Sequence, residues 1–281
     1  MKRRNFKFNK VIIGLIVVSI MTVVLVGCIK DDKNENKTIH LSTTTSVNDS
    51  GLLPYLQKNF EEDTEYLLEV SSAGTGAAIA KGEAGDADCL LVHDKVSEEK
   101  FIENGFGIKR EVLMYNYFVI IGPSSDPAGI RNTNTAADAF KAIAESESIF
   151  VSRGDDSGTN KAEMKIWDLI KTDPNGESWY RSVGQGMGAS INTAYEEGAY
   201  ILTDKATYLS HKLKDNFDLL LEESDDLKNT YSLIVINPEK WPDTNIDGAN
   251  AFVNWMLTDE VKQLIISYGL EEYGQQLFYI D

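Results

Sequence analysis

The sequence predicts an α/β fold of two lobes, each a mostly parallel sheet flanked by helices. Short apolar runs alternate with helical patterns, which is the arrangement of β–α–β units. About 245 residues follow residue 37, a length that suits two hydrophobic cores better than one. Two apolar runs, 117–122 and 231–237, are each followed directly by a proline, as expected of strands that end where the chain leaves a sheet.

Strands are expected, in chain order, at 38–42, 66–71, 88–93, 117–122, 149–152, 217–221 and 231–237. The two runs that precede proline are apolar throughout, as strands buried on both faces are. We interpret them as a two-strand hinge between the lobes. Lobe 1 then comprises 38–119 and 234–281, and lobe 2 comprises 120–233.

The N-terminus has the three parts of a lipoprotein leader. Residues 1–10 carry basic side chains and no acid, residues 11–26 are mostly apolar, and a Leu-Val-Gly-Cys sequence ends at Cys28. The apolar run is short for a membrane span of about 20 residues. We therefore expect a signal peptide at 1–27, a lipidated Cys28, and a polar tether at 28–37. The mature protein would be anchored by lipid to the outer face of the cell membrane.

The charge balance excludes nucleic acid as a partner. Five of the 27 basic residues lie in the predicted leader, so that 22 remain against 44 acidic residues. Nucleic-acid binding needs basic patches, which such a surface does not provide. An anion would have to be held by local donors rather than by overall charge. The second cysteine, Cys89, lies in an apolar run and is expected to be a buried, inert thiol.

Three loops rich in hydroxyl groups and glycine each lie between an apolar strand and a helical pattern, at 43–46, 74–76 and 152–160. Backbone N–H groups at a helix start have no intrahelical partner, and glycine lets an anion approach them. The same residue types are ordinary helix caps, so one loop alone would indicate little. Three such loops, one of which contains Arg153, predict an oxyanion site.

The chain resembles the tungstate-binding lipoproteins of bacterial ABC importers, within the two-lobed, type II periplasmic-binding-protein superfamily. The matching segments run in order along nearly all of the predicted mature chain: 43–46, 49–53, 74–76, 85–88, 90–93, 114–120, 152–159, 184–188 and 198–204. The resemblance implies a monomer without a cofactor that captures tungstate or molybdate in the cleft between its lobes. It also implies delivery of the anion to a membrane permease with its own ATPase.

The resemblance carries ligand-binding roles to nine residues: Thr44, Thr45, Ser46, Gly74, Thr75, Arg153, Ser157, Gly158 and Thr159. Arg153 would neutralise part of the anion's charge and offer a fork of N–H donors. Its alternative role is an ion pair with Asp155 or Asp156. Residues 184–188 either supply backbone donors or form a flexible connection.

Two other functions stay open from the residues. The first is phosphate binding, because an Arg followed by Asp-Ser-Gly-Thr is also used in that superfamily. Hydrogen phosphate carries a proton and needs an acceptor, for which Asp49 is the candidate. The second is a surface sensor or adhesion lipoprotein that keeps the fold without delivering a solute.

An enzyme is not expected. No nucleophile–histidine–acid arrangement or phosphate-binding Walker motif is visible in the sequence. The histidines, His40, His93 and His211, lack the spacing of metal ligands and are expected in packing or surface positions. We also expect no metal cation, and we expect Asp204 to cap the following helix.

Overall fold

The computed structural model describes residues 37–211 and 216–280. The predicted leader, Cys28 and nearly all of the tether lie outside the described residues. In the described part of the chain, no helix has the length and apolar character needed to cross a membrane.

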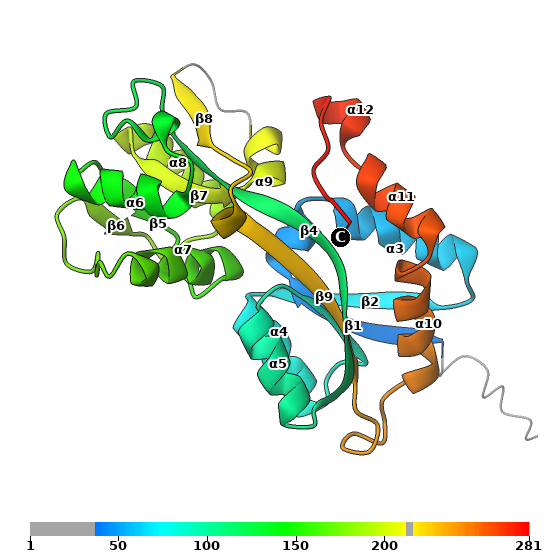
Figure 1. The fold of residues 1–281 in the computed structure, drawn as a ribbon. Helices are drawn as coiled ribbons and strands as arrows, with labels where there is room; N and C mark the ends of the chain where they lie inside the picture. The colour runs from blue at the N-terminus through cyan, green and yellow to red at the C-terminus, as the bar shows by residue number, and fades with distance from the viewer. Residues whose placement is uncertain (1–36, 212–215, 281) are drawn as a thin grey trace, which may run out of the picture. The chain divides into compact units, whose positions relative to one another are not determined.

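The described residues form mixed sheets flanked by helices, which confirms the predicted α/β class (Figure 1). The strands are β1 (Thr38–Thr44), β2 (Leu67–Ala73), β3 (Cys89–Val92), β4 (Gly107–Pro123), β5 (Phe150–Ser152), β6 (Tyr180–Ser182), β7 (Tyr200–Asp204), β8 (Phe217–Leu221) and β9 (Lys228–Ile236). Their order is β2-β1-β3-β9-β4-β7-β5-β6, and β8 pairs with β4.

Helices fill most connections between the strands. They are α2 (Thr45–Asp49), α3 (Leu52–Asp63), α4 (Thr75–Ala84), α5 (Lys95–Glu103), α6 (Ala136–Glu145), α7 (Gly158–Leu169), α8 (Met187–Glu197), α9 (Lys205–Ser210), α10 (Ile246–Met256), α11 (Asp259–Ser267) and α12 (Leu270–Tyr273). Short 3-10 turns lie at Ile130–Asn132 and Asp225–Leu227.

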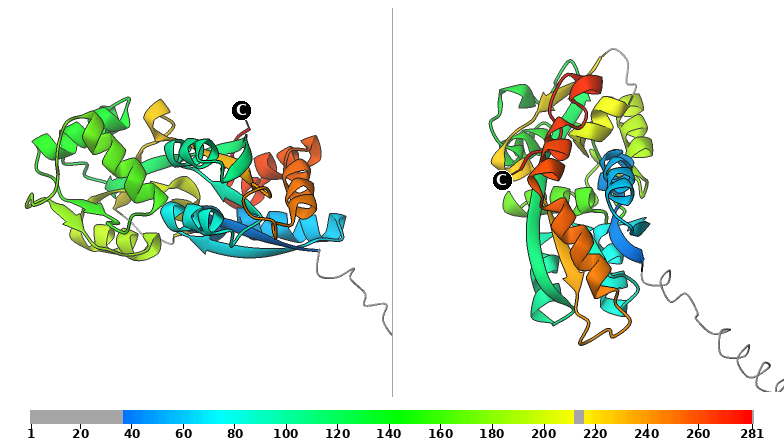
Figure 2. Two further views of the ribbon diagram at one scale, coloured as in Figure 1. Left: turned by 90° about the horizontal axis from the view of Figure 1, so that it is seen from below. Right: turned by 90° about the vertical axis from the view of Figure 1, so that its right-hand side faces the viewer.

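Strands that are connected through helices pair in parallel, whereas the long strands β4 and β9 pair antiparallel with their neighbours. β1 pairs in parallel with β2 and β3, and β5 pairs in parallel with β6 and β7. β4 is antiparallel to β9 up to Tyr117 and antiparallel to β7 from Phe118 onward. One strand therefore passes from the first group of strands to the second, and β9 lies beside it (Figures 1 and 2).

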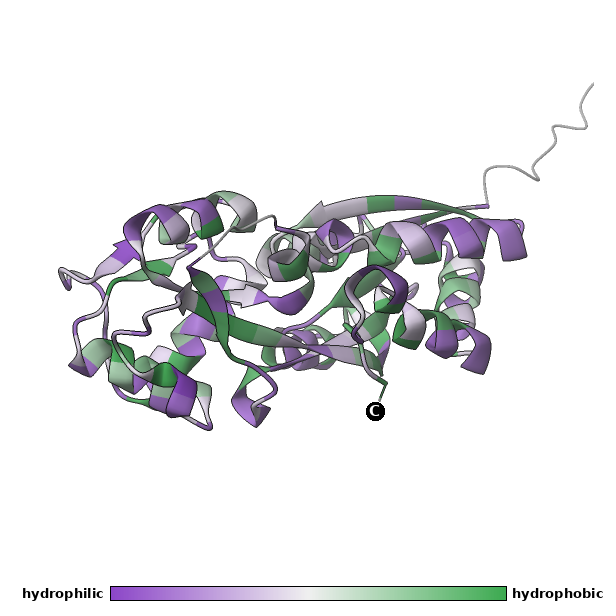
Figure 3. Ribbon diagram, turned by 90° about the horizontal axis from the view of Figure 1, so that it is seen from above, coloured by the Kyte–Doolittle hydropathy of each residue, from purple (hydrophilic) through white to green (hydrophobic). Residues whose placement is uncertain are grey.

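Apolar side chains on both faces of the strands form the core. Helices α3, α10 and α11 bury residues such as Phe60 and Phe252 against one face of β1 and β9, and α4 and α5 cover the other face. On one face of β5 and β7, helices α6 and α7 bury residues such as Trp167. On the other face, α8 buries Ile191. The strands accordingly carry much of the apolar colour in Figure 3, whereas the helices alternate between apolar and hydrophilic residues.

The predicted strands are all present, although their limits differ. β4 begins at Gly107 rather than at residue 117, and the strands β6 and β7 were not expected. β6 is three residues long and largely exposed, so it leaves no apolar run in the sequence. β9 already pairs with β4 at Lys228. The division into lobes at 38–119, 120–233 and 234–281 remains a prediction.

Candidate anion-binding site

The first predicted loop is the junction of β1 and α2. Thr44 ends the strand and occupies the N-cap position of the helix, but its side chain makes no capping hydrogen bond. Its hydroxyl instead lies 3.1 Å from Ser46 Oγ. Ser46 Oγ also lies 3.2 Å from His93 Nε2 and 3.4 Å from the Tyr231 hydroxyl. Thr45 and Ser46 are the first two residues of α2.

The second loop joins β2 to α4. Gly74 is the N-cap and Thr75 begins the helix, and again no side chain caps the backbone N–H groups. Thr75 is completely buried. Within the part of the chain that the structure describes, Thr75 Oγ1 has no hydrogen-bond partner. A buried hydroxyl without a partner costs about 1–3 kcal/mol, so this donor is held in place by the rest of the fold.

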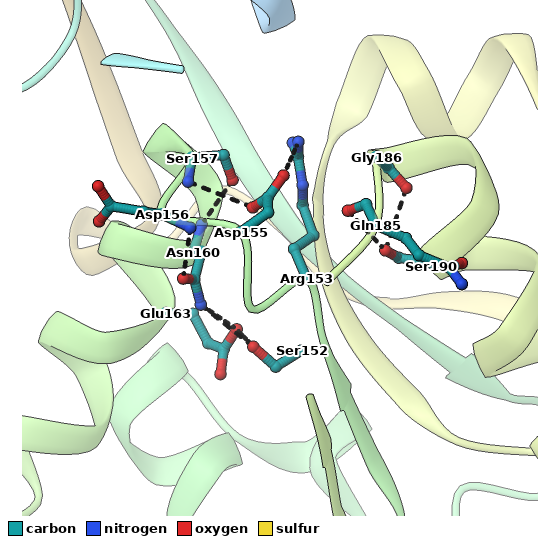
Figure 4. Close-up of polar contacts among 10 residues, drawn as sticks. All are labelled: Ser152, Arg153, Asp155, Asp156, Ser157, Asn160, Glu163, Gln185, Gly186 and Ser190. Carbon is teal, nitrogen blue, oxygen red and sulfur yellow. Dashed lines mark hydrogen bonds and ion pairs between the residues drawn. The ribbon is translucent and has the colours of Figure 1, made fainter. Parts of the chain in front are cut away.

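The third loop joins β5 to α7 and contains Arg153, which is only 8% exposed. Arg153 Nη2 donates to Asp155 Oδ2 at 2.6 Å, and the backbone N–H of Ser157 donates to Asp155 Oδ1 at 3.2 Å (Figure 4). Asp155 therefore connects the guanidinium to the start of the helix. Arg153 Nε is buried and, among the described residues, has no partner.

A buried carboxylate fixes the base of this loop. Glu163 accepts hydrogen bonds from Ser152 Oγ at 2.6 Å and from Trp167 Nε1 at 3.0 Å. Asn160 donates from Nδ2 to Ser152 Oγ and accepts from the backbone N–H of Asp156, both at 3.1 Å (Figure 4). Burial raises the pKa of Glu163, whereas these donors act in the opposite direction. The hydrogen bonds of Glu163 and Asn160 therefore hold the loop against α7.

The first and third loops line one pocket of about 220 Å³. The predicted residues in its wall are Thr45, Ser46 and Arg153. The other lining residues are Asp49, Gly186, Met187, Gly188, Asp204, Thr207 and Ser210. Gly186 is the N-cap of α8, whose first turn has no side-chain cap. Residues 186–188 of the glycine-rich segment therefore lie in the pocket wall.

The second and third loops touch each other. A Cβ on Gly74 would lie 3.8 Å from Asp156 O and from Ser157 Cα. A Cβ on Gly158 would lie 2.9 Å from Thr75 Oγ1 and would overlap the His93 ring. Glycine is required at 158 because the chain segments approach so closely. The other six predicted residues do not line this pocket: Thr44, Thr75, Ser157 and Thr159 are buried, Gly74 lies beside the third loop, and Gly158 lines a larger pocket.

The pocket contains acidic as well as cationic groups. Asp204 is buried and accepts from Thr207 N at 2.8 Å and from Thr207 Oγ1 at 2.6 Å, so it caps α9 as predicted. Burial raises its pKa, and the nearby Arg153 acts in the opposite direction. Asp49 also lines the pocket. Binding of an anion must therefore depend on directed donors, because Asp49 and Asp204 offset the charge of Arg153.

A larger pocket of about 540 Å³ includes His93, Gly158 and several lysines. Its cations are partly neutralised within the chain: Lys165 pairs with Asp94 at 2.9 Å, and Arg110 pairs with the buried Glu98 at 2.7 Å. It is also large for a tetrahedral anion. The smaller pocket is therefore the better candidate. No cluster suited to a metal cation occurs among the described residues.

Two residues of this region were not predicted as functional. Asp204 is the last residue of β7, as Thr44 is of β1, and this position at a strand end could have identified it. His93 was expected in packing or at the surface. It is half-buried, and desolvation of the ring lowers its pKa to about 4, so the ring is neutral near pH 7. Its contact with Ser46 could not be read from the sequence because 47 residues separate them.

The fold and the pocket together define a solute-binding domain. Residues 32–260 match the PBP superfamily domain, and this match covers most of the chain. Tungstate-binding protein TupA of Peptoclostridium acidaminophilum is 40% identical over 271 residues, which are 93% of this chain and 94% of that protein. The chain belongs to the PBP superfamily and, within it, to the family of this TupA protein.

Solved structures give the same result. The tungstate-binding protein TupA from Desulfovibrio alaskensis is 41% identical with a TM-score of 0.79, over 87% of this chain and 98% of that chain. A structure described as the tungstate ABC transporter from Geobacter sulfurreducens is 41% identical with a TM-score of 0.74, over 83% of this chain and 99% of that chain. The predicted resemblance is confirmed.

Proposed function

We propose that this protein is an extracytoplasmic solute-binding protein that captures tungstate or molybdate and delivers it to an ABC permease. The names of the TupA relatives support the ligand, and the Geobacter structure supports the transporter. Binding without catalysis is consistent with these relatives. Neither phosphate binding nor a sensor role is favoured by them.

The observation that carries the proposal is a pair of buried donors in the predicted loops. Thr75 Oγ1 and Arg153 Nε have no partner among the described residues, although each is at least nine-tenths buried. A buried polar group without a partner is costly. An oxyanion that accepts hydrogen bonds from these groups would remove that cost, which is why we assign them to ligand binding.

The nine predicted residues would act in three ways. Arg153 would neutralise charge, with its orientation set by Asp155. The hydroxyls of Thr44, Thr45, Ser46, Thr75, Ser157 and Thr159 would donate hydrogen bonds. Gly74 and Gly158 would let backbone N–H groups approach the anion. The predicted lobes would close over this site and exclude water.

Tungstate and molybdate differ from phosphate in a way that this site can detect. Both are fully deprotonated near neutral pH and only accept hydrogen bonds, whereas hydrogen phosphate also brings a proton. Asp49 is the predicted acceptor for such a proton, and Asp204 lines the same pocket, where each of its oxygens accepts from Thr207 and keeps a second lone pair. Without an acceptor the phosphate proton would be buried unpaired, at a cost of about 1–3 kcal/mol.

A thermal-shift series tests the proposal. Tungstate and molybdate should raise the melting temperature at low concentration, because ligand stabilisation follows occupancy of the native state. Sulfate, which is smaller, and phosphate should not. Stabilisation by phosphate at concentrations where tungstate has no effect would instead favour a phosphate-binding protein, with Asp49 as the first acceptor to test.

We also propose that the mature protein begins at a lipidated Cys28. The basic segment, the apolar run and the Leu-Val-Gly-Cys sequence support this assignment. Lipid attachment would hold the binding domain at the outer face of the membrane, next to the permease.

A further inference from the structure

His93 lies where the three predicted anion-binding loops approach one another. It follows β3 and is half-buried. Its Nε2 is 3.2 Å from Ser46 Oγ of the first loop. The same edge of the ring, Cε1 and Nε2, occupies the space that a Cβ on Gly158 would need, next to Thr75 Oγ1. The ring therefore contacts one loop by a hydrogen bond and another by close packing.

The Ser46 hydroxyl has more neighbours than it has hydrogens. Thr44 Oγ1, His93 Nε2 and the Tyr231 hydroxyl lie within 3.1 to 3.4 Å of Ser46 Oγ. A serine hydroxyl donates one hydrogen bond and accepts two. If its single hydrogen points to a neighbour within the protein, none remains for a ligand.

An oxyanion without protons can only accept, so Ser46 must donate to it. Ser46 Oγ must then accept hydrogen bonds from its neighbours, and its two lone pairs allow two of the three neighbours to donate. The histidine is the one neighbour whose hydrogen has a fixed direction, because its ring is packed against Tyr231 at a centroid distance of 4.9 Å and against Gly158. The hydroxyls of Thr44 and Tyr231 can rotate about their C–O bonds.

We propose that His93 is a positioning residue that directs the Ser46 hydroxyl at the anion. In the anion complex the neutral ring carries its hydrogen on Nε2 and donates it to Ser46 Oγ. This leaves the Ser46 hydrogen available for the ligand. The inference rests on the proposed function, since it specifies how one residue of that site is oriented.

The tautomer of His93 can be observed directly. The chain has three histidines, so the imidazole ¹⁵N signals of the full-length protein can be assigned by substituting His40 and His211 in turn. Spectra are recorded with and without sodium tungstate at pH 7. In the complex we expect His93 Nε2 to be the protonated nitrogen. An unprotonated Nε2 in a protein that binds tungstate would overturn this inference and leave the proposed function intact.

Variants provide a second, independent test. His93→Leu removes the donor, and His93→Gln keeps an amide N–H at the end of the side chain. We expect His93→Leu to weaken tungstate binding by about tenfold, because Ser46 would lose its hydrogen bond to the charged anion. His93→Gln should restore most of that loss. His211→Leu, whose ring contacts the exposed Asn192, is the matched control.

A double variant of Ser46 and His93 tests whether His93 acts on tungstate binding through Ser46. In a Ser46→Ala background there is no hydroxyl to direct, so His93→Leu should have little further effect on tungstate affinity. An equal loss in both backgrounds would show that His93 acts independently of Ser46 and would overturn the inference. Absence of tungstate binding by the parent protein would overturn the proposed function as well.

Discussion

Arg153 donates from Nη2 to Asp155 Oδ2 at 2.6 Å, and its Nε remains buried without a partner among the described residues. The two roles considered for Arg153, ion pair and ligand contact, are therefore compatible in geometry. Asp155 uses one edge of the guanidinium, and other N–H groups stay available for an oxyanion. A planar guanidinium has five such donors in fixed directions, which lysine could not reproduce.

Replacing Arg153 by alanine should weaken tungstate binding by about a hundredfold or more, the size expected when a desolvated charged contact to a ligand is lost. Titration calorimetry measures the affinity, and circular dichroism checks the fold. Arg131→Ala is the matched control, since Arg131 pairs with Asp218 at 3.0 Å and is half exposed. If Arg153→Ala binds tungstate as tightly as the parent protein, Arg153 forms an ion pair with Asp155 and does not contact the ligand.

Thr75→Val should separate binding from stability. Valine has nearly the shape of threonine, and the hydroxyl that it removes is buried without a partner. We expect the free energy of unfolding without ligand to rise by about 1 kcal/mol and tungstate affinity to fall by about tenfold. Chemical denaturation and calorimetry measure the two effects.

Thr43→Val is the control for this substitution. Thr43 is equally buried but its hydroxyl donates to Leu91 O at 2.7 Å, so its replacement should lower stability. A loss of stability in Thr75→Val as large as that in Thr43→Val would mean that the Thr75 hydroxyl has a partner within the protein.

His93 should make stability depend on pH. Burial lowers its pKa from 6.5 to about 4, so the unfolded chain binds a proton at a higher pH than the folded protein does. The free energy of unfolding should therefore fall between about pH 6.5 and pH 4, by on the order of 3 kcal/mol in total. His93→Gln lacks this contribution, and the difference between variant and parent isolates it from carboxylates such as Asp204. Equal pH dependence in both proteins would contradict the assignment.

Substituting Cys28 by alanine should block leader processing and lipid attachment. The expected result is an uncleaved chain without acyl groups, since the thiol at the predicted cleavage site is the acceptor of the lipid. Mass spectrometry of the protein from membranes measures this. An unmodified Cys28 in the parent protein, or cleavage at another residue, would contradict the prediction.

Much of the fold could be predicted because local patterns determine it. The apolar runs at β1, β3, β5, β8 and β9 appear in the sequence as short, buried segments. β7 is entirely buried as well, but it was not predicted. The buried Cys89 was also predicted correctly, and burial raises the pKa of its thiol.

The composition of the pocket could be predicted only in part. Loops that follow strands can be recognised in the sequence by their hydroxyl groups and glycines, and this pattern identified Thr45, Ser46 and Arg153. Contacts between distant segments have no such signal. The approach of His93 to Ser46, and of Gly158 to Thr75, results from the packing of separate β–α units, and no local pattern encodes that packing.

The position of bound tungstate is the most direct test of the proposed site. Crystals of the protein grown with tungstate can be measured at an X-ray wavelength where tungsten scatters anomalously. We expect one strong anomalous peak in the pocket of Thr45, Ser46 and Arg153, with tungstate oxygens within hydrogen-bond distance of Ser46 and Arg153. A peak in the larger pocket beside Lys161 and Lys165, or no ordered tungsten at all, would contradict the proposed site.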